Sequence, residues 1–449
     1  MAVTAVTTSM AGAINYTFTT DTSGDFASVA NSTYFYNKAD KLVRYKDSTG
    51  AVLEIFSASG GASGIFGIAN TSGVYTYYAT PALAYAAATA GQTIEMFADY
   101  TSSGIEELAI TKNVNWNGNG HTWTKSATGT THIITCALAN CDFRMTGLNL
   151  IRTNGTSSDV YTATCFVSIS PATGKIDMDG CFFENRNTGS AVALCMGSST
   201  LEITGVTCKS VNTSAFISPN NIVSNCYFSG VTGIDMRGIA NFCYAQGTTG
   251  IGFFAQNGTS SNCVGVSASG AGFYATYGNM YNCIGRSTTE SGFVANQCND
   301  VIDCVGISTS GYGFYANACG KNVTGNTGIS SSSYGFRFQT PHCFNQTAIT
   351  TSGIAIFDTA SSGKLYNASI ISSWNNAGGY GINGNGSLPV SIINCQFQLA
   401  NSSAPYIYVG GTAAVIKMRG NTYEGGAAFN ANITQGIVNT EDNQGNIYL

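Results

Sequence analysis

One short apolar pattern returns at a nearly constant interval in the middle of the chain. Each copy reads Gly-Phe-x-Ala or, once, Gly-Phe-x-Phe, and successive copies are 20, 20, 21 and 22 residues apart. The copies begin at Gly252, Gly272, Gly292, Gly313 and Gly335. A second pattern keeps the same interval, with Cys243, Cys263, Cys283 and Cys304. Such self-similarity predicts a solenoid in which each copy is one coil.

The composition of each copy indicates the kind of solenoid. The copies contain short runs of Phe, Tyr, Val, Ile and Cys separated by small residues, without the leucines of a leucine-rich repeat or the 3.6-residue periodicity of a helical repeat. We therefore predict an all-β fold, a parallel β-helix with about 20 to 22 residues per rung. Equivalent residues of neighbouring rungs would then stack about 4.8 Å apart.

Because equivalent residues stack in columns, we can predict for each column whether it faces the core or solvent. The phenylalanine column never changes, so we expect it inside: Phe253, Phe273, Phe293, Phe314 and Phe336. The next residue points the opposite way in a strand, which defines an outward aromatic column: Phe254, Tyr274, Val294, Tyr315 and Arg337. We expect this outward column to be a glycan-binding or subunit interface.

A related pattern extends over the rest of the chain from residue 140 onward. It reads apolar-x-apolar-x-Gly/Asn-apolar-x-apolar, for example at residues 143–150 and 416–423. Gly, Asn and sometimes Asp adopt left-handed backbone angles at low cost, so this position predicts a sharp bend. The bend column comprises Gly147, Gly180, Gly205, Asn225, Asn262, Asn282, Asp303, Asn394 and Gly420.

The sequence predicts that the chain has four parts. Residues 1–57 form strand-like runs and a tight turn, typical of a small β module that attaches a solenoid to something. Residues 58–74 are rich in Gly, Ser and Ala and predict a linker. Residues 75–424 form the β-helix, opened by a capping helix over 81–90 with Thr80 and Pro81 at its start. Residues 425–449 close the chain.

The entrance to the coil also carries a family resemblance. An Ala-rich helix is followed by Ala-Gly-Gln-Thr-Ile at 90–94, Ile-Thr-Lys-Asn-Val at 110–114 and Gly-Asn-Gly at 118–120. This order resembles the opening of right-handed parallel β-helix proteins of the pectate-lyase-like superfamily, including phage tailspikes. The resemblance covers residues 75–449 and implies a right-handed coil; many such proteins bind or cleave polysaccharide.

Charge and hydropathy argue against nucleic acid and membrane as partners. Only 9% of the residues are charged, the net charge is −5, and the 18 Lys and Arg residues do not cluster, so we do not expect nucleic acid binding. The sequence has no run of 18 apolar residues and no basic N-terminal region before an apolar core. We expect neither membrane insertion nor export by a signal peptide.

The cysteines predict a reduced protein. Their number, 15, is odd, and many recur in register with the repeat. We interpret the repeated cysteines as a ladder of buried thiols, with Cys298 and Cys319 as a short second ladder. A metal site is the alternative, but there are no paired Cys-x-x-Cys units and only three His. We expect no metal and no cofactor, and synthesis in the cytoplasm of a host cell.

The carboxylates offer one catalytic alternative. Asp177 and Glu202 share an outward column with Arg144, and Asp179 and Glu184 lie nearby. Two carboxylates on adjacent rungs could form the acid and base of a glycoside hydrolase. They could also form a charge ladder compensated by Arg144, which we favour. Weaker candidates are Asp235 with Arg237, Glu290 with Arg286, and Asp303, which we interpret as a bend residue.

A neutral surface points to the function. Between Gly238 and Asn299 the only charged residues are Arg286 and Glu290. Outward aromatic residues among polar neutral ones suit stacking on sugar rings or packing against identical subunits, and we favour the subunit contact.

Our first hypothesis is a homotrimeric virion appendage of a phage: a tailspike, tail fibre or head fibre. Its N-terminal module would dock on other virion proteins and its β-helix would bind host surface polysaccharide, which places it on the virion surface. The second is a polysaccharide depolymerase, either a glycoside hydrolase or a lyase, that uses Asp177, Asp179, Glu184 and Glu202. The third is a bacterial surface adhesin, disfavoured by the missing signal and by the cysteines.

Overall fold

A computed structural model describes most of the 449 residues. Residues 1–57 are described by the backbone of their strands. The longer described segments are 64–102, 108–125, 133–136, 140–153, 173–186, 202–320, 322–339, 342–358, 364–373, 390–400 and 415–425. The shorter ones are 138, 167–169, 193–196, 382–384, 407–409, 433–434, 437–438 and 447–448.

The chain divides into two compact units, Met1–Ala84 and Tyr85–Leu449. The first unit contains a sheet in the order β1-β2-β3-β4-β5, antiparallel except between β2 and β3. Its strands are β1 (Ala5–Ser9), β2 (Asn15–Asp21), β3 (Thr33–Asn37), β4 (Leu42–Lys46) and β5 (Val52–Ser57). These strands lie within residues 1–57, where we expected a β module.

The segment expected to be a linker contains a strand. β6 (Phe66–Ala69) pairs antiparallel with β7 (Tyr75–Tyr78). The reason is burial: Phe66 is 0% and Ile68 6% exposed, so apolar side chains interrupt the small-residue stretch. Residues 58–63 lie outside the described residues.

The helix expected over 81–90 is observed as α1 (Pro81–Ala87). Its start follows the sequence signal, because the Leu83 amide donates to Thr80 Oγ1 at 3.3 Å. It ends at Ala87, earlier than expected, and there Lys112 Nζ donates to the carbonyls of Ala86, at 3.1 Å, and Ala88. In the second unit Tyr85 stacks on Trp116, with ring centroids 6.4 Å apart, so the helix end covers the first rung.

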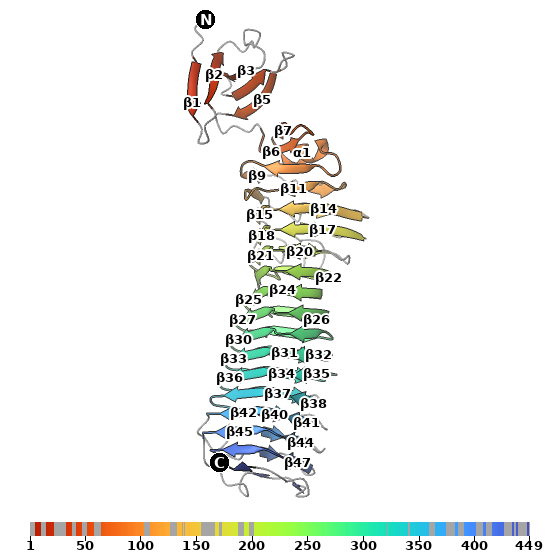
Figure 1. The fold of residues 1–449 in the computed structure, drawn as a ribbon, viewed down its shortest axis with the longest axis vertical. Helices are drawn as coiled ribbons and strands as arrows, with labels where there is room; N and C mark the ends of the chain where they lie inside the picture. The colour runs from red at the N-terminus through yellow and green to blue at the C-terminus, as the bar shows by residue number, and fades with distance from the viewer. Residues whose placement is uncertain are drawn as a thin grey trace. The chain divides into compact units, whose positions relative to one another are not determined.

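The second unit is a parallel β-solenoid, which confirms the predicted fold class (Figure 1). Within the described residues one sheet, called sheet I below, has 16 strands, one beside the next along the coil. Its strands are β9 (Tyr100–Ser102), β12 (Thr122–Lys125), β15 (Asn149–Arg152), β18 (Phe182–Asn185), β21 (Thr207–Ser210), β23 (Tyr227–Gly230), β25 (Tyr244–Gly247), β27 (Val264–Ser267), β30 (Ile284–Ser287), β33 (Val305–Ser308), β36 (Thr327–Ser330), β39 (Thr347–Thr350), β42 (Ser369–Ser372), β45 (Gln396–Leu399), β48 (Thr422–Glu424) and β51 (Ile447–Tyr448).

Sheet II collects the other strand segments of each rung. They are continuous in the long strands β22, β24 and β26 and divided elsewhere, as in β31 and β32. Its strands in the second unit are β8 (Thr93–Met96), β10 (Leu108–Ile110), β11 (Asn115–Asn117), β13 (Ile134–Cys136), β14 (Asn140–Thr146), β16 (Val167–Ile169), β17 (Thr173–Asp179), β19 (Leu194–Met196), β20 (Glu202–Thr204), β22 (Phe216–Ser224), β24 (Ile234–Asn241), β26 (Phe253–Ser261), β28 (Phe273–Thr276), β29 (Asn279–Tyr281), β31 (Phe293–Asn296), β32 (Asp300–Ile302), β34 (Phe314–Asn317), β35 (Asn322–Thr324), β37 (Phe336–Gln339), β38 (His342–Phe344), β40 (Ile356–Asp358), β41 (Lys364–Tyr366), β43 (Ile382–Gly384), β44 (Val390–Ile393), β46 (Ile407–Val409), β47 (Val415–Arg419), β49 (Ile433–Thr434) and β50 (Ile437–Val438). Parallel pairing continues through β49, β50 and β51, inside the segment 425–449.

The phenylalanine column is inside the coil, as predicted. All five side chains are 0% exposed. Successive ring centroids are 4.6, 4.8, 4.8 and 4.8 Å apart, with interplanar angles of 7° or less. The rings therefore repeat at the strand spacing and form one continuous aromatic core.

Small residues on sheet I make room for this stack. A Cβ on Gly285 would lie 2.1 Å from the Gly292 carbonyl oxygen and 2.9 Å from the Phe273 Cβ. The same close approach recurs at Gly265, Gly306 and Gly328. Two residues further along each strand, a buried serine faces inward: Ser267, Ser287, Ser308 and Ser330.

The predicted bend column is confirmed, since all nine of its residues have left-handed angles, with φ between 52° and 66°. The structure adds two features that the sequence did not indicate. Phe242 occupies the same column with φ of 53°. A second left-handed column comprises Asn257, Tyr277, Gln297 and Ala318.

The cysteine ladders are buried, as predicted. Cys243, Cys263, Cys283 and Cys304 are at most 2% exposed, as are Cys298 and Cys319. All twelve cysteines within the described part of the chain are free thiols and buried. The thiol of Cys283 donates to the Tyr281 carbonyl at 3.4 Å, and its neighbours in the ladder bond in the same way.

Candidate functional site

Sheet II brings the outward aromatic column together in one line. The pairing places Phe254 beside Tyr274, then Val294, Tyr315 and Arg337, on β26, β28, β31, β34 and β37. Phe254 and Tyr274 are half-buried and meet edge to face, with centroids 5.4 Å apart. Because the strand neighbours of these residues fill the core, their own side chains lie on the outer side of the sheet, although Val294 is only 7% exposed there.

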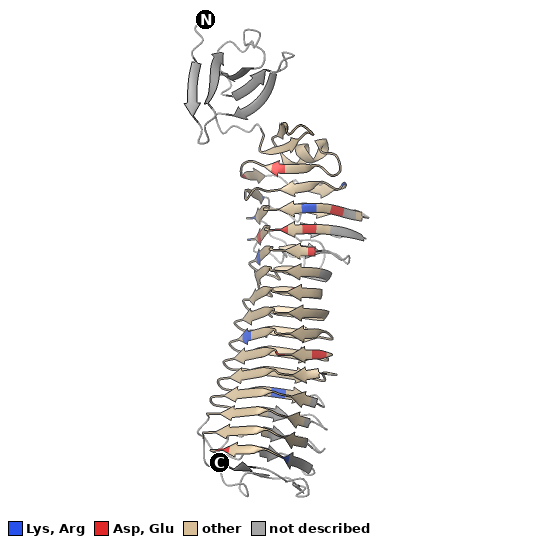
Figure 2. Ribbon diagram, in the orientation of Figure 1, with Lys and Arg blue, Asp and Glu red and all other residues tan. Residues whose placement is uncertain are grey.

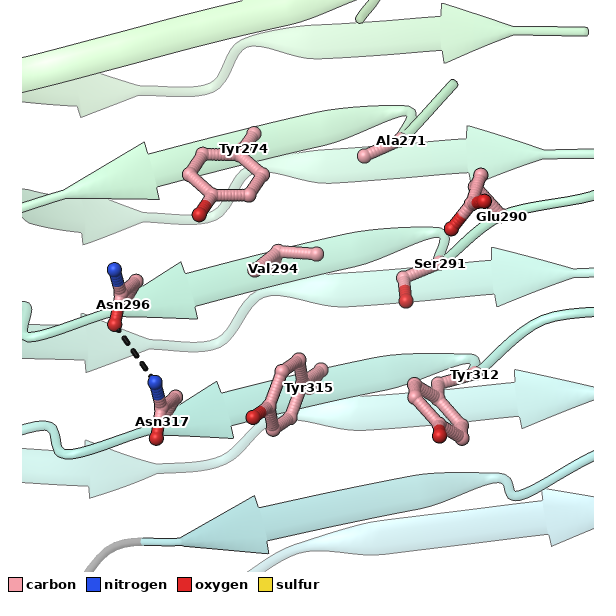
Figure 3. A pocket seen from close by; sticks show the side chains of 9 residues that line it. All are labelled: Ala271, Tyr274, Glu290, Ser291, Val294, Asn296, Tyr312, Tyr315 and Asn317. Atoms are coloured by element: carbon pink, nitrogen blue, oxygen red, sulfur yellow. Dashed lines mark hydrogen bonds between the residues drawn. The ribbon is translucent and has the colours of Figure 1, made fainter. Parts of the chain in front are cut away.

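A hollow of about 280 Å³ opens in this column. Its floor is Val294, which lies between Tyr274 on the preceding strand and Tyr315 on the next (Figure 3). Valine is much smaller than the tyrosines beside it, so the hollow is the space that a third aromatic ring would fill.

Polar groups line both sides of the hollow. On one side Asn317 Nδ2 donates to Asn296 Oδ1 at 2.9 Å (Figure 3). On the other side lie Glu290, Ser291 and Tyr312. Glu290 is exposed.

Arg337 contacts two tyrosines beside the hollow. Arg337 donates to the Tyr312 hydroxyl at 2.8 Å. Its guanidinium lies 5.0 Å from the ring centroid of Tyr312 and 4.8 Å from that of Tyr315. Burial raises the pKa of Tyr315, so its hydroxyl stays protonated at neutral pH and donates to Gln339 Oε1.

The predicted acidic residues lie elsewhere on sheet II. Asp177 and Glu202 are paired in register on β17 and β20. Arg144 on β14 lies between the two aspartates, with Nε 3.7 Å from Asp177 Oδ2 and a terminal nitrogen 3.3 Å from Asp179 Oδ2. These charges gather on adjacent strands (Figure 2), and the arginine contacts fit a compensated charge ladder.

Glu184 is separated from this cluster because it lies on sheet I, in β18. Its carboxylate accepts a hydrogen bond from Arg186 at 2.7 Å, and its register partner on β21 is Lys209. The structure thus brings Asp177, Asp179 and Glu202 together but places Glu184 beyond the bend.

The weaker candidates are dispersed. Asp235 continues the outward aromatic column one rung before Phe254. Its pKa is raised, because the effect of burial exceeds the opposing effect of Arg237. Glu290 lines the hollow, whereas Arg286 is on the outer face of sheet I. Asp303 has φ of 54° and is a bend residue, as expected.

The sequence interpretation missed most of the hollow. Asn296 and Asn317 were not singled out, although Ala-Asn follows Phe-x at both places. Tyr312 was missed because it lies in a turn and not in the repeated phrase.

Within the described segments, no group of three or more His, Cys, Asp or Glu is arranged to hold a metal ion. None of the helices described is long and apolar enough to cross a membrane.

No protein-family model matches the chain, and no curated protein matches it in sequence. Among solved structures, the A-module of mannuronan C-5 epimerase AlgE6 from Azotobacter vinelandii is similar over 78% of this chain and 99% of its own, with 9% identity and a TM-score of 0.36. The catalytic domain of GH87 alpha-1,3-glucanase in complex with nigerose is similar over 79% of this chain and 63% of its own, with 9% identity and a TM-score of 0.22. At these values neither similarity assigns a function to this chain.

Proposed function

We propose that this protein is a glycan-binding appendage of a phage virion, a tailspike, tail fibre or head fibre, and that the outward aromatic column of sheet II binds host surface polysaccharide. The observation that carries the proposal is the hollow over Val294, with a tyrosine at each end and amides along one side. The hollow favours sugar binding over a subunit contact as the role of this column.

The chemistry of the hollow suits a sugar ring. The faces of Tyr274 and Tyr315 offer apolar platforms for the C–H face of a pyranose. The amides of Asn296 and Asn317 and the carboxylate of Glu290 offer donors and acceptors for hydroxyl groups. Concave apolar sites with a few polar groups are typical of small-ligand binding, and adjacent rungs would extend the platform along a chain of sugars.

The hollow supports binding better than cleavage. Glu290 is the only carboxylate among the residues that line it, whereas most glycoside hydrolases use a pair. The described part of the chain therefore offers no acid and base together at this position.

The virion role rests on the order of the parts. A separate β unit precedes a long coil with few charges, the arrangement expected when one end attaches and the wall recognises a surface. The N-terminal unit would dock on other virion proteins, and the protein would lie on the virion surface after synthesis in the host cytoplasm.

The test is an array of purified bacterial capsular polysaccharides and lipopolysaccharide O-chains, probed with the full chain. We expect wild type to bind at least one glycan. Tyr315→Ala should weaken that binding about two- to tenfold, because loss of an aromatic contact costs about 0.5 to 1.5 kcal/mol. Val294→Tyr should do the same by filling the hollow.

The matched control is Tyr366→Ala, a half-buried outward tyrosine on β41 away from the hollow. It should bind as wild type does. Equal binding by wild type, Tyr315→Ala and Val294→Tyr would remove the hollow as the site.

A depolymerase is the second candidate, favoured by the register of Asp177 with Glu202. Adjacent strands lie about 4.8 Å apart, close to the separation of about 5 to 5.5 Å between the two carboxyl groups of retaining glycosidases. The same glycans are assayed for new reducing ends. Cleavage that Asp177→Asn with Glu202→Gln abolishes would establish the enzyme; unchanged cleavage by that variant would exclude this pair.

A further inference from the structure

In the middle strands of sheet I the small residues face the core and the large apolar residues face outward, the reverse of an ordinary sheet. Their inward positions hold Gly and Ser, as in Gly306 and Ser308 on β33. Their outward positions hold large aliphatic side chains, as in Val305 and Ile307 on the same strand. Sheets with one solvated face normally show apolar residues inside and polar residues outside, so this reversal indicates that the outer face is covered.

The outward aliphatic residues lie on successive strands and form a surface that we call the aliphatic wall. Arg286 stands in one of its columns, between Val266 and Ile307. Its residues are half-buried by their own neighbours and lie on β27, β30, β33, β36, β39 and β42. They are Val264, Val266, Ile284, Val305, Ile307, Ile329, Ile349 and Ile371. Four of them are isoleucines paired rung on rung, from Ile307 to Ile371.

The wall carries little charge and few groups that would select a foreign partner. Along the outward positions from β23 to β42 the single charged residue is Arg286. Beside the isoleucine column stand Thr327, Thr347 and Ser369. Monomeric proteins rarely expose an apolar surface of this continuity.

The size of the face fits self-association. The aliphatic wall continues onto β23 and β25, where Tyr227 and Tyr244 face outward and stack with ring centroids 5.3 Å apart. Together these eight strands, about 4.8 Å apart and about four residues wide, give on the order of 500 Å² per copy, so two copies bury about 1,000 Å², near the lower bound for a specific interface. Columns with a one-rung repeat match an identical surface, because the side chains of one copy fit between the rungs of another.

We infer that copies of this chain pack against one another through the aliphatic wall of sheet I. The outward aromatic column lies on sheet II and stays exposed in such an assembly. Subunit packing and glycan binding thereby occupy different faces, and the proposal does not depend on the glycan.

The test is the mass of the full chain in solution, measured by sedimentation equilibrium at micromolar concentration. We expect a mass of two or more whole chains. Ile329→Lys with Ile349→Lys should give the mass of a single chain, because it places lysines in a desolvated contact. Since both side chains face outward, the far-ultraviolet circular dichroism should match that of wild type.

The matched control is Gln396→Lys with Gln398→Lys, two exposed positions on β45 of the same sheet. It should keep the wild-type mass. Should the lysine pair on the wall unfold, Ile329→Thr with Ile349→Thr keeps strand propensity and should raise the dissociation constant tenfold or more. A wild-type monomer, or an unchanged assembly in the wall variants, would overturn the proposal.

Discussion

At the scale of the residue, Phe242 conflicts with its position. It has φ of 53° in a column that elsewhere holds Asn, Asp and Gly, and its side chain is 63% exposed. A left-handed conformation costs an ordinary L-residue about 1 to 2 kcal/mol, less for Asn. An exposed ring recovers little of that cost through packing.

Phe242→Asn is therefore expected to stabilise the coil by about 1 kcal/mol. Asn225 and Asn262, the equivalent residues of the neighbouring rungs, already adopt this conformation. Thermal unfolding followed by circular dichroism measures the effect. Phe242→Ala is the control: it removes the ring but keeps a residue unsuited to the angle, so it should not stabilise. A lower midpoint for the Asn variant would contradict the argument.

At the scale of the element, a serine at the end of each sheet I strand closes the following turn. Ser308 Oγ donates to the Glu290 carbonyl at 2.6 Å and accepts from the Gly311 amide at 2.9 Å. Ser267, Ser287 and Ser330 make the same pair of bonds on their rungs. The turns that carry Glu290 and Tyr312 are held in place by these hydroxyls.

Ser308→Ala should lower the free energy of unfolding by about 1 kcal/mol, because it leaves the partly buried Glu290 carbonyl and Gly311 amide without their partner. Ser310→Ala, at an exposed position of the same turn, should be nearly neutral. Chemical denaturation of both variants gives the comparison. The proposed glycan affinity should fall in the first variant alone, since Glu290 belongs to the hollow.

At the scale of the whole molecule, buried thiols run through most of the coil, from Cys136 to Cys395 among the described residues. Burial raises the pKa of Cys181 and of Cys395 from 9.0 to about 11. Burial also raises the pKa of Cys283 and Cys208. These thiols stay protonated at neutral pH, consistent with their role as small apolar side chains.

The stability of the coil should therefore fall in alkali. Above pH 9 the unfolded chain releases thiol protons that the folded chain retains up to about pH 11. The thiol contribution is complete below pH 9 and is lost as the pH rises through this window. Thermal midpoints across this range should fall less steeply for Cys181→Ala with Cys395→Ala than for wild type. Parallel curves would show that these thiols do not titrate as argued.

The sequence predicts those parts of the coil that one residue type fills in every rung. The phenylalanine stack and the Gly/Asn bends follow from repetition together with the few residues that fit each place. The serine column was missed because Ser is common in turns, so burial at Ser308 is invisible without the fold. Phe242 was missed because nothing in its chemistry favours a left-handed angle.

The hollow illustrates a further limit. In the sequence Val294 is one more member of a variable outward column. Its importance comes from the size difference to Tyr274 and Tyr315, which matters only once the three strands lie side by side. The aliphatic wall was missed for a related reason: alternation alone does not tell which side of a strand faces the core when small residues form the core side.

Because the register between rungs is strict, the rungs are interchangeable units that set the length of the coil. Asn262 and Asn282 are equivalent, as are Cys263 and Cys283, so excising residues 263–282 would join Asn262 to Cys283 as Asn282 is joined now. A gene that duplicates or drops such a unit changes the length of the coil by one rung and keeps its stacked phenylalanines, bends and thiols. The outward neighbours change, since Phe254 would adjoin Val294 in place of Tyr274.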